Sequence, residues 1–372
     1  MGGSTGADVA QQTATEAAAE NRPGGRDGPR WRNAARLAVA VILTTMIVVF
    51  HRDFARSISV LAHLNVRWYA LAVLAEIVSV TSFALSRRRL LAVGGRPPRR
   101  RAMVAITVSG SAMSMSLPFA GTGLAAFYEY KQFRRHGVDA ATTGWALAVS
   151  GIFSTSALAL LLVIGAVLGG RGIGAAVGFA GAALYLVPGV AVLLALRYRQ
   201  VREGLSRLFL RLARYIQRRP WRPSTQDRLD RLDGLPAQLE EFLDRIASLR
   251  LPPRGALAVF GLATLNWAAD CAALALAIHA TGSPVPWHAL LLAWGAGAAV
   301  GSTGLTPGGF GLVELAVAAA LTAGGLPASG ALASVLAYRV INFWLVNGVG
   351  LLVILRPRGR REQAGTPVES GR

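Results

Sequence analysis

The chain has 372 residues, of which 53% are hydrophobic and only 16% are charged, and its formal net charge is +20. Soluble domains carry roughly 25% charged residues, so this composition excludes a typical soluble enzyme. Apolar runs long enough to cross a bilayer alternate with arginine-rich segments, a pattern typical of helical membrane proteins with positive cytoplasmic loops. We therefore predict an all-α polytopic membrane protein, and we attribute the charge to membrane topology rather than to nucleic-acid binding.

The domain boundaries follow from the same composition. We predict a disordered cytoplasmic tail over 1–33, a transmembrane domain over 34–356 and a second disordered cytoplasmic tail over 357–372, because both ends are polar and lack hydrophobic runs. The single cysteine, Cys271, excludes an internal disulfide and a cysteine-based zinc site. We expect no cofactor and no metal.

The first two apolar runs, over about 38–50 and 68–86, are predicted to leave the cytoplasm and return to it. The loop that follows, 87–101, is rich in arginine and carries the turn signal Pro97 and Pro98. Its positive charge places this loop on the cytoplasmic side of the membrane.

The next apolar stretch, 102–130, is interrupted at Pro118, Gly121 and Gly123. It begins and ends beside basic residues, so both of its ends are predicted to be cytoplasmic. A segment that starts and ends on one side is not a simple span. We predict a re-entrant hairpin of two half-helices, a backbone form tolerated at membrane depth only where protein or a wet cavity shields it.

A long helix over 140–168 is predicted to cross outward, and a return helix ends near residue 196. The basic segment 197–254 then contains two stretches with the helical spacing of apolar residues, which predicts two amphipathic helices. They lie either on the membrane surface, with arginines at anionic headgroups, or against the cytoplasmic face of the protein itself.

The stretch 256–280 is predicted to cross outward again. A second broken segment, from 290 to 323 with its break at 304–311, is a further re-entrant candidate, entered from outside. The last helix, 330–355, returns to a basic tail. The predicted total is about six full transmembrane helices plus two re-entrant hairpins, or about eight apparent spans, with both termini cytoplasmic.

The two broken segments resemble each other in sequence, and their predicted entry from opposite faces suggests an inverted repeat. Such repeats often place a substrate site at broken half-helices near the midplane of the membrane. Shared alanine and glycine content is the alternative explanation. The matching residues are Pro118, Gly121, Gly123 and Glu129 in the first segment and Pro307, Gly309, Gly311 and Glu314 in the second.

The stretch from Pro307 to Glu314 is the most informative part of the sequence. Its glycines, Gly308, Gly309 and Gly311, permit a tight turn with positive φ, and the turn opens a helix. Free backbone N–H groups at such a helix start suit an anionic phosphate. The alternative is a packed turn in which Glu314 caps these N–H groups.

Arg339 is predicted to lie well inside the last helix, where a charged side chain costs on the order of 3 kcal/mol on insertion scales. Glu314 and Asp270 are the candidate partners of this arginine. It then serves either as a phosphate-binding group or as one half of a static ion pair. Glu76 is a further mid-span acid, and it suits either a polar contact between helices or a role in a cavity.

Three stretches of the sequence together resemble a known family. They are Asn-Trp-Ala-Ala-Asp (266–270), Thr-Pro-Gly-Gly-Phe-Gly-Leu-Val-Glu (306–314) and Tyr-Arg-Val-Ile-Asn-Phe-Trp (338–344), followed by Gly350. They resemble the flippase-like transmembrane domain of lysylphosphatidylglycerol synthases, over about residues 35–356. The resemblance implies re-entrant segments, a cavity that accommodates lipid, and movement of aminoacylated phosphatidylglycerol between leaflets. It does not extend to a synthase domain.

The sequence departs from that family at one position. Many relatives carry an arginine early in the helix that follows the first broken segment, whereas this chain has Ser150 and Gly151 there. Phosphate binding by the first repeat is therefore not carried over from the resemblance.

The expected function is an inner-membrane lipid translocase for an anionic or aminoacylated phospholipid or a polyprenyl-linked glycolipid, and not an enzyme, because no catalytic motif is evident. One alternative is a non-transporting partner of a separate lipid- or envelope-glycan-modifying enzyme. Another is a membrane transferase for a polyprenyl-phosphate sugar. The candidate binding residues are Pro307, Gly308, Gly309, Gly311, Glu314, Arg339, Asp270, Pro118, Gly121, Gly123 and Glu129.

Overall fold

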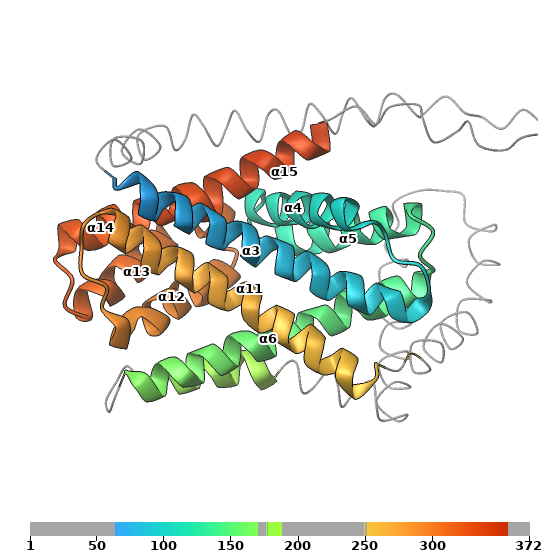
Figure 1. The fold of residues 1–372 in the computed structure, drawn as a ribbon, viewed down its shortest axis with the longest axis horizontal. Coiled ribbons are helices and arrows are strands. Elements are labelled where there is room, and N and C mark those ends of the chain that lie inside the picture. Colours follow the sequence, from blue (N-terminus) through green and yellow to red (C-terminus); the bar gives the residue numbers. More distant parts are fainter. Residues whose placement is uncertain (1–63, 170–175, 177, 188–248, 250, 356–372) are drawn as a thin grey trace, which may run out of the picture. The chain divides into compact units, whose positions relative to one another are not determined.

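A computed structural model describes residues 64–169, 176, 178–187, 249 and 251–355, which all belong to one compact unit of the chain. Every element in these ranges is a helix (Figure 1). The predicted tails, the first apolar run and nearly all of the amphipathic segment 197–254 lie outside the described residues.

The described helices follow one another in chain order, with short 3-10 turns η1 and η2 and a π-helical stretch η3 between them. They are α3 (Val66–Leu91), η1 (Ala92–Gly94), α4 (Arg100–Ser116), α5 (Gly121–Arg135), α6 (Ala140–Leu168), α11 (Pro253–Ala280), α12 (Trp287–Ser302), η2 (Pro307–Gly309), α13 (Leu312–Ala323), α14 (Ala328–Arg339), η3 (Val340–Leu345) and α15 (Val346–Leu355). A further short apolar helix, Gly178–Val187, lies between α6 and α11 in the chain.

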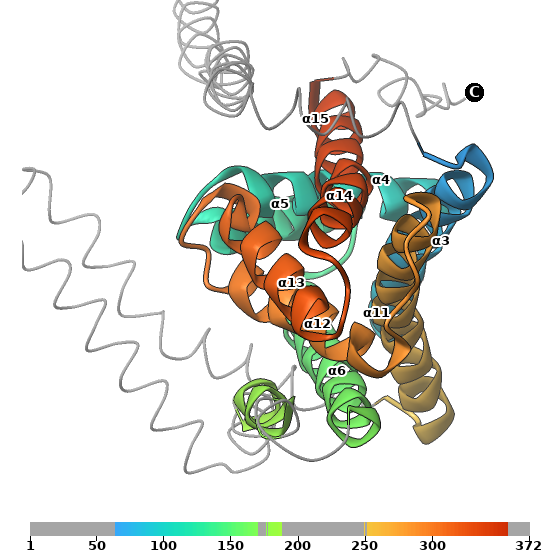
Figure 2. The ribbon, with the colours of Figure 1, turned by 90° about the vertical axis from the view of Figure 1, so that its left-hand side faces the viewer.

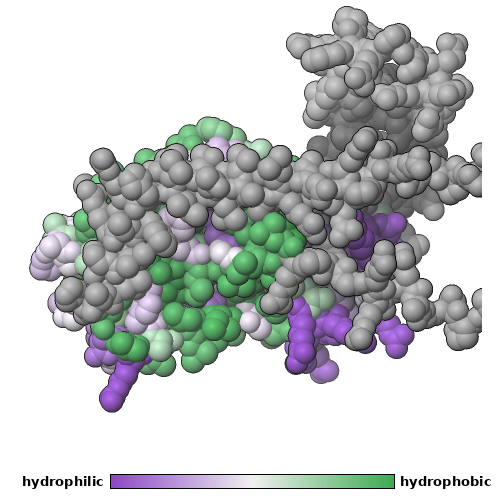
Figure 3. All heavy atoms as spheres, turned by 90° about the horizontal axis from the view of Figure 1, so that it is seen from above, coloured by the Kyte–Doolittle hydropathy of each residue, from purple (hydrophilic) through white to green (hydrophobic). Residues whose placement is uncertain are grey.

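Four of the described helical segments are long and apolar enough to cross a membrane, which makes this a multi-pass membrane protein. They are Val66–Gly94, Ala140–Leu168, Pro253–Ala280 and Ala328–Leu355, the last comprising α14, η3 and α15. Hydrophobic side chains fill the middle of the face seen in Figure 3, while hydrophilic ones gather toward its ends. The total of eight spans and the inverted repeat stay predictions.

Local sequence explains where several of these helices begin. The Asp139 side chain accepts a hydrogen bond from the backbone N–H of Thr142 and so caps α6. Asn65 caps α3 in the same manner, through the N–H of Arg67. Pro253 occupies the first turn of α11, where a missing N–H costs nothing.

The two broken segments form helical hairpins that open at opposite ends of the bundle. Helix α4 packs against α5, and α12 packs against α13. At the arginine-rich end, one hydrophobic cluster joins the termini of five helices through Leu91, Met103, Phe133, Trp145 and Val259. Because Met103 lies in the first turn of α4 and Phe133 in the last turn of α5, the first hairpin is entered and left at this end.

The second hairpin opens at the other end of the same bundle. A Cβ added at Gly324, just after α13, would lie 2.5 Å from the Cβ of Ala289 near the start of α12. The end of α11 also meets the start of α3 there, because the N–H of Asn65 donates to the carbonyl oxygen of Ala280 at 2.9 Å. Helices α3 and α11 therefore run antiparallel, side by side (Figures 1 and 2).

Close packing of α15 on α4 ties the last helix to the first hairpin, and it depends on Gly350. A Cβ at this position would lie 2.4 Å from the carbonyl oxygen of Val108. We expect Gly350→Ala to lower the melting temperature of the detergent-purified protein, because contact with backbone at this distance forces the helices apart.

Gly348 provides the matched control, because a Cβ there meets no atom within 4 Å. Gly348→Ala should keep or raise the melting temperature, since alanine favours a helix over glycine by about 1 kcal/mol. Equal melting temperatures for the two variants would contradict close packing at Gly350.

Candidate functional site

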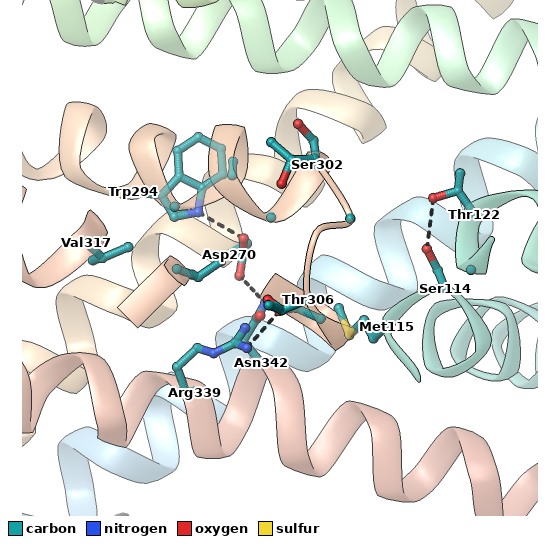
Figure 4. Close-up of a pocket in the computed structure, with 18 of the residues that line it drawn as sticks. Ser114, Met115, Thr122, Asp270, Trp294, Ser302, Thr306, Val317, Arg339 and Asn342 are labelled. Atoms are coloured by element: carbon teal, nitrogen blue, oxygen red, sulfur yellow. Dashed lines mark hydrogen bonds between the residues drawn. The ribbon is translucent and has the colours of Figure 1, made fainter. Parts of the chain in front are cut away.

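A cavity of about 370 Å³ lies between the breaks of the two hairpins (Figure 4). Its walls come from the α4–α5 break, the α12–α13 break, the middle of α11, and the junction of α14 with η3. The breaks touch directly, since the N–H of Phe119 donates to the carbonyl oxygen of Gly304 at 2.9 Å. Segments almost two hundred residues apart in sequence thus share one site.

The second break needs glycine for its shape. Gly308 and Gly309 have φ values of 57° and 69°, in the left-handed region that favours glycine. A Cβ at Gly308 would also lie 2.0 Å from the ring of Phe343. Both the left-handed backbone conformation and the clash with Phe343 therefore exclude other residues at this position. The turn brings the Gly308 carbonyl oxygen against the last span.

Asp270, in the middle of α11, is buried at the cavity wall and accepts hydrogen bonds from three donors. Trp294 Nε1 donates to Oδ2 at 2.9 Å, and the Tyr338 hydroxyl and Asn342 Nδ2 donate to Oδ1 at 2.7 and 2.8 Å. The helices that carry these donors are thereby fixed around one carboxyl group (Figure 4). Three donors stabilise the ionised form of that group.

Arg339 is 4% exposed and lines the cavity, and its charge is balanced by Glu314 rather than by Asp270. Its Nε donates to Glu314 Oε1 at 2.5 Å, and its Nη2 donates to the carbonyl oxygen of Gly308 at 2.8 Å. The guanidinium also lies 4.5 Å from the ring centre of Phe343. The sequence had left both acids open as partners.

The glycine turn does not present all the backbone donors that its sequence suggested. The N–H of Gly309 donates to Thr306 and that of Phe310 donates to Pro307, so both are used inside the turn. Glu314 pairs with Arg339, and its second carboxylate oxygen has no partner in the described part of the chain. The alternative in which Glu314 caps this turn is therefore wrong: the turn offers a carbonyl to Arg339 instead.

The structure divides the predicted site residues into two groups. Asp270, Gly308, Arg339 and Gly121 line the cavity. Those that do not line it are Pro118, Gly123, Glu129, Pro307, Gly309, Gly311 and Glu314. Of the second group, Glu314 is ion-paired with the cavity residue Arg339.

Several residues that line the cavity were not among the predicted binding residues. Tyr338 and Asn342 are four positions apart in the last span, so they share one helix face, and this spacing was a usable signal. Trp294 and the hydroxyl residues of the cavity lie in apolar helices or in the turns between them, and no pattern in those segments distinguishes them from their neighbours. The hydroxyl residues are Ser114, Thr122, Ser302, Thr303 and Thr306.

The last span departs from α-helical geometry beside the site. Residues Val340–Leu345 form the π-helical stretch η3, directly after Arg339. Such insertions are rare and occur frequently at functional sites, because they re-aim the side chains around them. In Figure 4, Arg339 and Asn342 project from this region toward Asp270 and Thr306.

The first hairpin contains its own arginine–glutamate pair, away from the cavity. Glu129 in α5 is buried and forms a salt bridge with Nη1 of Arg87, from the end of α3. The Nε of Arg87 also donates to the hydroxyl oxygen of Ser150 at 3.4 Å. Helix α3 therefore supplies the positive charge opposite Glu129.

These features define a polytopic helical membrane protein with a mostly apolar cavity between two broken hairpins, into which Arg339, Asp270 and several hydroxyl groups face. The chain matches the family described as the lysylphosphatidylglycerol synthase TM region over residues 33–350, and it belongs to that family. Its function is accordingly related to membrane lipids. Comparison with individual curated proteins gives no match.

Proposed function

We propose that this protein is a lipid translocase that moves an anionic or aminoacylated phospholipid, or a polyprenyl-linked glycolipid, between the leaflets of the inner membrane. The observation that carries the proposal is Arg339, a buried cation at the wall of a cavity enclosed by two broken hairpins. Charged groups at membrane depth mostly mark substrate pathways. The family supplies the connection with membrane lipid.

The cavity suits a headgroup rather than a whole lipid. Its volume of about 370 Å³ holds a phosphate and a small substituent, while the acyl chains remain in the bilayer. Arg339 has N–H groups beyond the two that bond Glu314 and Gly308, and a guanidinium binds phosphate oxygens well. The hydroxyl groups of both hairpins add polar atoms to a lining that is otherwise mostly apolar.

Transport fits the buried carboxyl groups better than catalysis does. A transferase needs a carboxylate that is free to act as a base. Asp270 accepts three hydrogen bonds and Glu314 is ion-paired with Arg339, so both are engaged. We therefore propose that the lipid leaves the protein chemically unchanged. The arginine-rich end of the bundle supports an orientation with both termini in the cytoplasm.

Co-purified lipid tests the headgroup site directly. The full chain is extracted in mild detergent and its lipids are identified by mass spectrometry. We expect one anionic lipid class to be enriched in the wild type and lost in Arg339→Gln, because the positive charge that holds the phosphate has been removed.

Arg87→Gln is the matched control, since it also leaves a buried glutamate, Glu129, without its cation, but away from the cavity. This variant should retain the lipid. Equal lipid loss in both variants would point to general destabilisation, and unchanged lipid in Arg339→Gln would overturn the proposal.

A further inference from the structure

We propose that the carboxyl groups of Glu76 and Asp270 together form a proton-binding site, and that its proton is coupled to occupancy of the cavity. The second half of this inference rests on the proposed lipid translocation, whereas the first half stands without it. Glu76, in the middle of α3, is 5% exposed, and its carboxyl group lies within hydrogen-bonding reach of Asp270 on α11.

The balance of charge around the cavity requires a proton. Glu76, Asp270 and Glu314 are all buried, and the one arginine that lines the cavity, Arg339, is already paired with Glu314. Within the described ranges, neither Glu76 nor Asp270 forms a salt bridge. Two carboxyl groups in contact, both removed from water and without a cation, cannot both remain ionised.

The hydrogen bonds assign the proton to one partner of the pair. Asp270 accepts from Trp294, Tyr338 and Asn342, an arrangement that favours its ionised form. Glu76 has fewer such donors: Asn342 is its one neutral side-chain donor in the described part of the chain, and its Oε2 is buried there without a partner. The proton therefore resides on Glu76, and Asp270 accepts its hydrogen bond.

The pair has few titratable neighbours, so its own proton sets the local charge. Helix α6, which packs against both α3 and α11, contains no titratable residue, and those of α4 are Arg100 and Arg101 in its first turn. The groups that face the pair are Tyr338 and Cys271 beside Asp270, with Arg339 next along the last span. On α12, His288 lies in the first turn, at the far end of that helix from the break.

Asp270 connects this pair to the cavity, because it lines the wall whereas Glu76 does not. In the proton-transfer step, the pair takes up one proton from cavity water, which comes to rest on the Glu76 carboxylate, and it releases that proton to cavity water again. When the proton leaves, a second negative charge appears behind the cavity wall and repels an anionic headgroup. Headgroup binding and proton binding must therefore favour each other by equal factors.

Infrared difference spectroscopy detects the proton without any transport. The full-length protein is reconstituted in vesicles of phosphatidylethanolamine and phosphatidylglycerol, and the carbonyl band of protonated carboxylic acids is followed as pH is raised. We expect an acid band that disappears at high pH in the wild type and is missing from Glu76→Gln, which keeps the shape of the side chain.

Two further variants keep this test decisive. Glu129→Gln is the control: its carboxylate is paired with Arg87, so its removal should leave the acid band unchanged. Asp270→Asn should shift the pH at which the band disappears, because the acid on Glu76 loses its charged partner. An acid band that survives in Glu76→Gln, or one that responds to sodium but not to pH, would overturn the proton site.

A second measurement separates the coupling from the translocation itself. Movement of fluorescent phosphatidylglycerol is followed in the same vesicles with and without an imposed pH gradient. We expect the gradient to change the initial rate several-fold in the wild type and to have no effect in Glu76→Gln. A titrating acid band without lipid movement would refute translocation and keep the proton site, whereas lipid movement that ignores the gradient would refute the coupling.

Discussion

Removal of Arg339 alone is expected to destabilise the protein by about 3–5 kcal/mol, because it leaves the Glu314 carboxylate buried without its cation. Replacement of both partners, in Arg339→Met/Glu314→Leu, should recover most of that stability, since apolar residues of similar volume carry no desolvation cost. The double variant should nevertheless fail to retain lipid. The double variant would then show that the Arg339 charge is needed for lipid binding but not for stability.

Thermal unfolding in detergent measures the first effect, and lipid mass spectrometry measures the second. The same design at the other pair, Arg87→Met/Glu129→Leu, serves as the control. It should restore stability relative to Arg87→Met and keep the lipid, because that pair lies away from the cavity. Recovery of lipid in the Arg339→Met/Glu314→Leu variant would show that the Arg339 charge is structural only.

A side chain at Gly308 should be the most damaging small change in the second hairpin. Its φ of 57° is costly for alanine, and the added Cβ would lie 2.0 Å from the Phe343 ring. Overpacking of this kind costs typically 1–3 kcal/mol, and the left-handed backbone adds roughly 1–2 kcal/mol. We expect Gly308→Ala to lower the melting temperature and to displace the carbonyl oxygen that Arg339 binds.

Gly311 separates the cost of the left-handed backbone from the cost of the clash, because its φ is 80° but a Cβ there meets no atom within 4 Å. Gly311→Ala should therefore show the backbone cost alone. The second variant Gly308→Ala/Phe343→Leu should recover part of the loss by relieving the clash. If Gly308→Ala and Gly311→Ala unfolded at the same temperature, contact with Phe343 would have no part in the effect.

The sequence predicted the helices of the described region well. The expected helices 140–168 and 256–280 correspond to α6 (Ala140–Leu168) and α11 (Pro253–Ala280). The stretch 102–130 is interrupted at Pro118 as predicted, whereas Gly121 and Gly123 lie inside α5. These features are local. Proline and glycine restrict or free the backbone at their own positions, and hydropathy along a segment decides whether it can lie in a bilayer.

The sequence also located part of the site, since it singled out Asp270, Gly308 and Arg339. It did so because charged groups inside apolar helices are rare and expensive. It left the partner of Arg339 open, and it gave no indication that Glu129 would pair with Arg87 of α3.

Family membership, the two broken segments and the arginine inside the last span were thus determined by the sequence alone, because they depend on composition and short-range pattern. The ion pairs, the three donors on Asp270, its contact with Glu76 and the cavity were decided only by the tertiary structure. The physical reason is that each depends on how far neighbouring helices are rotated and shifted against one another. Many long-range packing contacts together fix that rotation, and no single segment encodes it.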